Sequence, residues 1–89
     1  MMELEIGKYY KTYYKNKTQL GFKTQKIYFT VLKIATYDDG GKSYKTKEWE
    51  ARSNWEPEKS GFSSDSILAK NSTFLTKQDI KELKLHRIK

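Results

Sequence analysis

The stretch with the most distinctive chemistry is Lys8-Tyr9-Tyr10-Lys11-Thr12-Tyr13-Tyr14-Lys15, which interleaves lysines with pairs of tyrosines. Successive side chains of a β-strand point to opposite faces. One face would therefore carry Tyr9, Lys11, Tyr13 and Lys15, and the other Tyr10, Thr12 and Tyr14. A single-layer domain can bury only one of these faces, so we expect at least one tyrosine pair to be exposed. Tyrosine rings beside ammonium groups are typical of proteins that bind single-stranded nucleic acid, because bases stack on the rings and lysines hold the phosphates. The alternative is that one pair lies in the core and the other covers the edge of the sheet, since tyrosine also favours strands.

Residues suited to catalysis are few. His86 is the one histidine, and its neighbours Lys84 and Arg87 disfavour both a metal ion and a protonated imidazole at this position. It also lacks a nearby partner that would make it a general base. We therefore interpret His86 as an exposed residue of the last element.

The acidic residues give no stronger indication of an active site. Glu48 and Glu50 would share one strand face, as paired catalytic carboxylates must, but a solvated strand face explains them equally well. Asp38-Asp39 lacks the further oxygen ligands of a calcium loop, and Ser63-Ser64-Asp65-Ser66 has no base nearby in sequence. The chain contains no cysteine. We expect no enzyme activity, no metal and no cofactor.

Charge is distributed unevenly along the chain. Its 18 basic and 11 acidic residues give a net charge of +7. The balance is +5 over residues 1–37, −2 over residues 38–66 and +4 over residues 67–89. A fold that brings the two ends together would gather the positive charge into one patch. We predict that ten residues from these ends contact nucleic acid: Lys8, Tyr9, Lys11, Tyr13, Lys15, Lys17, Lys23, Lys26, Lys84 and Arg87.

The choice of basic residue indicates how the nucleic acid would be bound. The chain has 16 lysines and two arginines. A lysine ammonium attracts phosphate but lacks the planar fork with which arginine reads guanine, so sequence-specific duplex recognition is disfavoured. Lysine therefore favours RNA or single-stranded DNA bound with little sequence preference.

The most strongly predicted secondary structure is a hairpin in the middle of the chain. The segment Ile27–Tyr37 is rich in β-branched and aromatic residues, and its apolar face switches near Val31 and Leu32, which predicts a β-bulge. Asp38-Asp39-Gly40-Gly41 predicts a turn, and Lys42–Ala51 alternates again as a second strand.

The other elements follow from local composition. Thr76 is a good N-cap with Asp79 at the N3 position, and Leu75 can pack on Ile80, so a helix is expected from Lys77 to about Leu83 or Leu85. The alternation in Leu85-His86-Arg87-Ile88 is equally compatible with a closing strand. The remaining expectations are a strand within Leu4–Tyr14, a polar loop over Asn16–Gly21, a turn over Asn54–Gly61, and a strand over Phe62–Ala69 with Phe62, Ile67 and Leu68 in the core.

These elements predict one mainly β domain over residues 1–89, because a chain of this length supports a single modest core. About four to five short strands and a short C-terminal helix indicate a small antiparallel SH3-like barrel, with an open antiparallel sheet covered by the helix as the alternative. The layout of Ile6-Gly7-Lys8-Tyr9-Tyr10, the strand Ile27–Leu32, the hairpin toward Trp49 and Leu75–Ile80 resembles the SH3-like or Tudor-like barrels common among accessory proteins of lytic phages. The resemblance implies a binding module with variable partners and assigns no catalytic residue.

We therefore expect a small basic module that binds RNA or single-stranded DNA, such as a phage accessory or anti-defence factor. The alternative is an inhibitor that blocks a host enzyme, for example a defence nuclease or a toxin, through aromatic anchors such as Trp49 or Trp55. An acidic N-terminus and the absence of cysteine favour the cytoplasm. The longest apolar stretch, Ile27–Leu32, is too short to span a bilayer, so neither a membrane nor a small-molecule substrate is expected.

Overall fold

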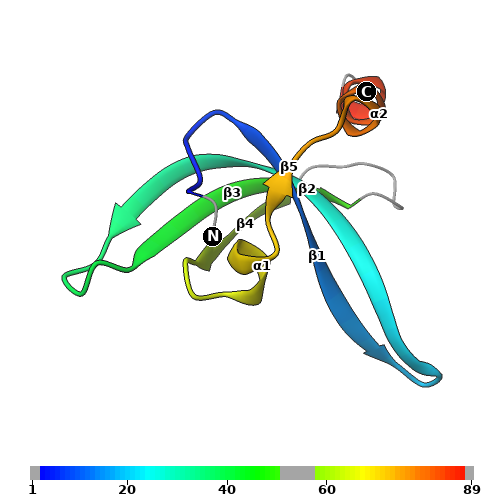
Figure 1. Cartoon of the computed structure of the whole chain (residues 1–89), viewed down its shortest axis with the longest axis horizontal. Helices are drawn as coiled ribbons and strands as arrows, with labels where there is room; N and C mark the ends of the chain where they lie inside the picture. The colour runs from blue at the N-terminus through cyan, green and yellow to red at the C-terminus, as the bar shows by residue number, and fades with distance from the viewer. Residues whose placement is uncertain (1–2, 51–57, 88–89) are drawn as a thin grey trace.

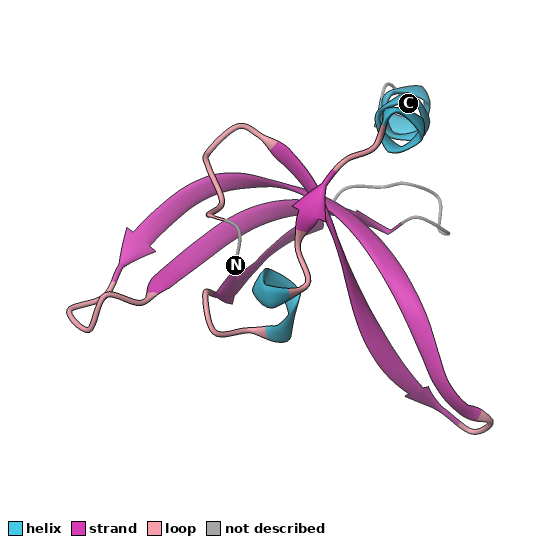
Figure 2. Ribbon diagram, in the orientation of Figure 1, coloured by secondary structure: helices cyan, strands magenta, loops and turns pink. Residues whose placement is uncertain are grey.

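The computed structural model of the chain describes residues 3–50 and 58–87, which form one antiparallel sheet and two helices (Figures 1 and 2). The strand order is β4-β3-β2-β1-β5. The strands are β1 (Tyr9–Thr18), β2 (Gly21–Thr36), β3 (Lys42–Glu50), β4 (Glu58–Ser63) and β5 (Thr73–Phe74), and the helices are α1 (Ile67–Lys70) and α2 (Lys77–Arg87). Within the described residues β4 and β5 form opposite edges, so the pairings make an open sheet, the second of the two predicted architectures.

The predicted central hairpin is confirmed. It consists of β2 and β3, which pair from Ile27 opposite Glu50 to Thr36 opposite Lys42. The pairing register shifts between Val31 and Lys33, which confirms the predicted bulge. Because the shift inserts one extra residue, Ile34 returns to the face on which Val31 is buried and packs against the same core.

The prediction of a polar loop over Asn16–Gly21 is wrong. β1 and β2 remain paired up to Thr18 opposite Gly21, so only two residues form the turn. Gly21 adopts a φ of 127°, which is easily accessible only to glycine, and the Thr18 hydroxyl donates to the Gly21 carbonyl at 3.0 Å. A polar sequence is compatible with strands here because this end of the hairpin is exposed to water.

The turn predicted over Asn54–Gly61 is also corrected. Residues 54–57 lie outside the described part of the chain, but Glu58–Gly61 belong to β4. Gly61 sits opposite Lys45, where an added Cβ would approach the Tyr44 carbonyl oxygen to 2.8 Å. Glycine at this position therefore permits close approach of two strands and does not mark a turn.

The strand predicted over Phe62–Ala69 is replaced by the end of β4 and the short helix α1. Ser66 caps α1 by accepting a hydrogen bond from the Leu68 amide at 3.2 Å, so the serine-rich segment ends one element and begins the next. Phe62 packs against the core as expected, whereas Ile67 is 61% exposed and is not a core residue.

One face of the sheet, the core face, holds the larger apolar cluster, which comprises Leu4, Tyr10, Phe29, Val31 and Tyr44. The N-terminal segment crosses this cluster, and the Glu5 amide donates to the Tyr10 hydroxyl at 2.9 Å. Helix α1 joins the same face through the Thr12 hydroxyl, which donates to the Leu68 carbonyl at 2.6 Å.

Two carboxylates lie opposite each other at the margin of the core face, where Glu48 of β3 pairs with Glu58 of β4. Burial raises the pKa of Glu48, the hydrogen bond from the Thr46 hydroxyl opposes this rise, and the Glu58 carboxylate adds to it. The ionised form of Glu48 is thus disfavoured in the folded state.

Replacing Glu48 by glutamine should therefore stabilise the protein at pH 7, by a few tenths to about 1 kcal/mol. The amide oxygen can still accept the Thr46 hydrogen bond while the like-charge repulsion disappears. The gain should vanish as the pH falls through the raised pKa of Glu48, because the wild-type side chain then also becomes neutral. Urea denaturation at pH 7 and at pH 4 measures both effects, and a loss of stability at pH 7 would contradict the prediction.

Candidate nucleic-acid interface

Strand alternation places lysines together on the face of the sheet opposite the core face. Because directly paired residues project to the same side, the register assigns eight lysines of the described strands to this lysine face. They are Lys11, Lys15 and Lys17 of β1, Lys26 and Lys33 of β2, Lys45 and Lys47 of β3, and Lys59 of β4. The two acidic strand side chains that the structure describes, Glu48 and Glu58, lie on the core face instead.

Four of the eight lysines on the lysine face are not among the ten contact residues predicted from the sequence. Lys33 lies in the first charge segment but was not among the ten chosen residues, and Lys45, Lys47 and Lys59 lie in the middle segment of net charge −2. The net charge of a segment does not show how its charged side chains divide between the two faces of the sheet, because neighbouring residues of a strand face opposite sides. The signal was present in Lys45-Thr46-Lys47-Glu48-Trp49, where both lysines fall on odd positions and the acidic Glu48 on an even one.

Six of the ten predicted contact residues lie on the lysine face, and the expected grouping of Tyr9, Lys11, Tyr13 and Lys15 on one side is confirmed by the register. Lys23 points to the other side of the same hairpin. Lys8 and Lys84 line a pocket beside α2, and Arg87 lies in α2 with a side chain outside the described part. The structure therefore gathers most of the predicted residues but not all of them. The six are Tyr9, Lys11, Tyr13, Lys15, Lys17 and Lys26.

The tyrosines of the Lys8–Lys15 run divide between the two faces. Tyr10 is fully buried in the core, whereas Tyr9 and Tyr13 on the lysine face are half-buried. Tyr9 packs against Trp49 with ring centroids 6.0 Å apart. The side chain of Tyr14 lies outside the described part of the structure. A fully exposed tyrosine pair is thus not found among the described tyrosines of the run, because packing beneath α2 covers part of Tyr9.

The end of the β1–β2 hairpin, residues 13–26, forms an arm that extends away from both helices (Figure 1). Lys15, Lys17 and Lys23 lie on the arm and are exposed. Phe22 is 74% exposed and sits opposite Lys17 on the lysine face, and Leu20 at the turn is fully exposed. No acidic residue occurs between Ile6 and Tyr37, so the arm is entirely basic in its charge.

Helix α2 begins with the predicted capping interaction. The Asp79 amide donates to the Thr76 hydroxyl at 3.1 Å, and the Thr76 amide donates to Asp79 Oδ2 at 2.9 Å. These reciprocal bonds form a capping box and confirm the predicted start of the helix at Lys77. The helix continues to Arg87, past the predicted end, so the closing strand considered for this segment is wrong.

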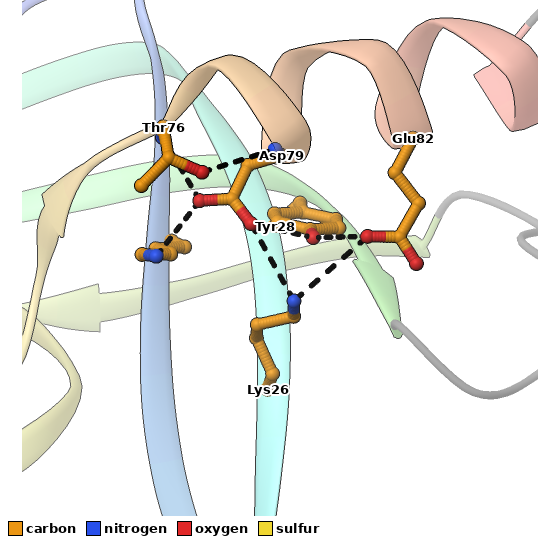
Figure 3. Close-up of polar contacts among 6 residues, drawn as sticks. Lys26, Tyr28, Thr76, Asp79 and Glu82 are labelled. Atoms are coloured by element: carbon orange, nitrogen blue, oxygen red, sulfur yellow. Dashed lines mark hydrogen bonds and ion pairs between the residues drawn. The ribbon is translucent and has the colours of Figure 1, made fainter.

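Asp79 also fixes α2 to the lysine face (Figure 3). Its carboxylate lies 2.7 Å from Lys11 Nζ and 3.5 Å from Lys26 Nζ, and Lys26 Nζ lies 4.0 Å from Glu82. The Tyr28 hydroxyl lies 3.1 Å from both Asp79 Oδ1 and Glu82 Oε2, and its hydrogen bond is shared between these two acceptors. Below the network, Leu83 of α2 packs on Tyr28 and the buried Trp49.

The network changes the ionisation of its members. Burial by itself would raise the pKa of Asp79, but hydrogen bonds from Lys11, Thr76 and Tyr28 outweigh it and hold that pKa well below its ordinary value. The hydrogen bond to Asp79 raises the pKa of Lys11. Burial, reinforced by the two carboxylates, raises the pKa of Tyr28 far above its ordinary value. Asp79 therefore stays ionised and Lys11 and Tyr28 stay protonated at neutral pH.

Two of the eight lysines are consequently occupied by α2. Lys11 and Lys26 neutralise Asp79 and Glu82, whereas the other six have no ion-pair partner within residues 3–50 and 58–87. Among these six, Lys47 lies against the aromatic cluster, with Nζ 5.5 Å from the centre of the Trp49 ring. The charge available to an anionic ligand thus lies on the arm and on the β2–β4 side of the sheet, on Lys15, Lys17, Lys33, Lys45, Lys47 and Lys59.

Comparison with known proteins gives no assignment, because no family model, curated protein or solved structure matches the chain. Among the described residues, no group of three or more histidine, cysteine, aspartate or glutamate side chains is placed to bind a metal ion. Nor does that part of the chain contain a helix of the length and apolar character needed to cross a membrane.

Proposed function

We propose that the protein binds RNA or single-stranded DNA with little sequence preference, and that the lysine face is its binding surface. The observation that carries the proposal is the sorting of charge by strand alternation. Six lysines without ion-pair partners in the described structure share this face with no described acidic side chain of the strands. A polyanion bound to this face would be attracted by the six lysines on either side of α2 and would release counterions as it bound.

The aromatic residues of the same face favour a single strand over a duplex. Phe22 and Tyr13 lie on the lysine side of the arm, with Lys15 and Lys17 beside them on β1. The exposed ring of Phe22 can stack on unpaired bases but cannot reach bases inside a duplex. Lysines hold phosphates without reading base edges, which agrees with weak sequence preference.

The proposal is tested by titrating labelled oligo-uridine and oligo-thymidine with the protein at several salt concentrations and recording fluorescence anisotropy. If all six lysines without partners contact phosphates, the logarithm of the association constant should fall with the logarithm of salt concentration at a slope near −4, from about −0.7 per contact. Absence of binding at low salt, or an affinity that does not change with salt, would overturn the proposal.

Replacing Phe22 by alanine should weaken binding by about 1–3 kcal/mol, because it removes one stacking surface. The side chain is 74% exposed, so the melting temperature should hardly change. Leu20→Ala is the matched control, since Leu20 is a fully exposed apolar residue of the same arm without a ring. Anisotropy titrations and thermal melts of both variants give the comparison, and equal losses of affinity would argue against stacking on Phe22.

A further inference from the structure

A cavity of about 450 Å³ lies where α2 meets the edge of the sheet. Two of its large apolar side chains are strongly exposed: Phe74 is 65% exposed and Ile80 is 42% exposed. The cavity thus leaves uncovered apolar surface that a ligand would bury. Its walls come from the start of β1, from β5, from the segment before α2 and from one side of α2, namely Lys8, Tyr9, Phe74, Leu75, Ile80, Leu83 and Lys84.

The lining determines which class of ligand fits. Apart from the Tyr9 hydroxyl, its polar side-chain groups are the ammonium groups of Lys8 and Lys84. A sugar or nucleobase would find few partners there for the hydrogen bonds it gives up to water, whereas an apolar chain would lose none. Lys8 is neutralised by Glu5 at 2.7 Å, but Lys84 has no ion-pair partner in the described part of the chain. An anionic headgroup would complement Lys84.

We propose that this pocket binds an amphiphile with one apolar chain and one carboxylate headgroup, with the chain between Tyr9, Phe74 and Ile80 and the carboxylate beside Lys84. The cavity volume falls within the range of about 300–1,000 Å³ that is usual for small-ligand sites. This proposal does not rest on nucleic-acid binding, because the lining shares only Tyr9 with the lysine face.

The first test is a titration of the full chain with octanoate, followed by amide NMR shifts. Saturable shifts should cluster at the residues that line the pocket. Hexanoate should bind about 15-fold more weakly, since each methylene is worth about fourfold. Heptyltrimethylammonium has the same alkyl chain as octanoate with the opposite charge and should bind at least tenfold more weakly than octanoate. Shifts spread over the lysine face, or equal binding of the cationic amphiphile, would overturn the proposal.

Two substitutions in α2 form a matched pair. Lys84→Met removes the ammonium group but keeps an apolar stem, and should weaken octanoate at least fivefold while leaving octanol binding unchanged. Lys81→Met removes the same charge from an exposed residue outside the lining, and should change octanoate affinity less than twofold. If the two substitutions weakened octanoate equally, the carboxylate would be attracted only by the net charge of the protein, and the proposal would be overturned.

A third substitution and a competition experiment complete the test. Ile80→Trp should fill the cavity and abolish binding of both octanoate and octanol, with helix content checked by circular dichroism. If that variant misfolds, the shift map and the Lys84→Met comparison still decide. Oligo-uridine should not displace octanoate. Displacement would show that the pocket belongs to the nucleic-acid interface and would overturn the proposal of a separate site.

Discussion

Asp79→Asn should reduce the free energy of unfolding by about 3 kcal/mol and lower the melting temperature by about 10–20 °C. Asp79 is only 4% exposed and its carboxylate faces both Lys11 and Lys26. Removing the negative charge leaves the mostly buried Lys11 ammonium without its counter-charge, and this is the costly part of breaking a buried ion pair. The asparagine oxygen can still accept the Thr76 amide, so most of the helix cap should survive.

Glu82→Gln is the control for this prediction. Glu82 belongs to the same network, but its side chain is 37% exposed and lies 4.0 Å from Lys26. Its replacement should cost less than about 1 kcal/mol, as is usual for exposed ion pairs. Urea denaturation of both variants gives the two free energies. Comparable small losses would show that Asp79 does not hold α2 to the sheet.

The pH dependence of stability provides an independent measure of the same interaction. The pKa of Asp79 is held below its ordinary value of 3.8, so its contribution to stability is complete above about pH 4. The contribution is lost as the pH falls below 4 through the depressed pKa, because the unfolded chain binds the proton more readily. Asp79→Asn should therefore lose stability less steeply than the wild type between pH 4 and pH 2. Parallel pH profiles for the two proteins would contradict the role given to Asp79.

Features that depend on neighbouring residues could be predicted from the sequence. The start of α2 follows from Thr76 and Asp79, which satisfy each other's amide groups within one turn. The bulge in β2 follows from the switch of apolar face after Val31. Both signals are local, so packing elsewhere did not overrule them.

Features that depend on distant contacts could not be predicted. Lys11 and Lys26 were selected as phosphate ligands, yet a carboxylate far along the chain pairs with both. Gly61 was interpreted as part of a turn, whereas its role is to let β4 approach the Tyr44 carbonyl of β3. In each case the deciding contact is with a residue distant in the sequence, so local composition could not indicate it.

The largest expected effect on nucleic-acid binding comes from the triple substitution Lys45→Gln, Lys47→Gln and Lys59→Gln. All three side chains lie on the lysine face of β3 and β4 and have no ion-pair partner in the described structure. Removing three phosphate contacts should reduce the salt slope by about 2 units. Extrapolated from 1 M salt, this corresponds to a loss of affinity of roughly 400-fold near 50 mM salt.

The matched control is the triple substitution of Lys42, Lys70 and Lys81 by glutamine, which removes the same charge away from the lysine face. Lys42 falls on the core side of β3 and is paired with Glu3, Lys70 ends α1, and Lys81 is exposed on α2. If net charge alone attracted the nucleic acid, both triple variants would lose the same affinity, because each retains a net charge of +4 from the original +7. If the nucleic acid instead contacts the lysine face, the Lys45, Lys47 and Lys59 variant should lose much more affinity than the control. Equal salt slopes for the two variants would therefore remove the basis for placing the nucleic acid on this face.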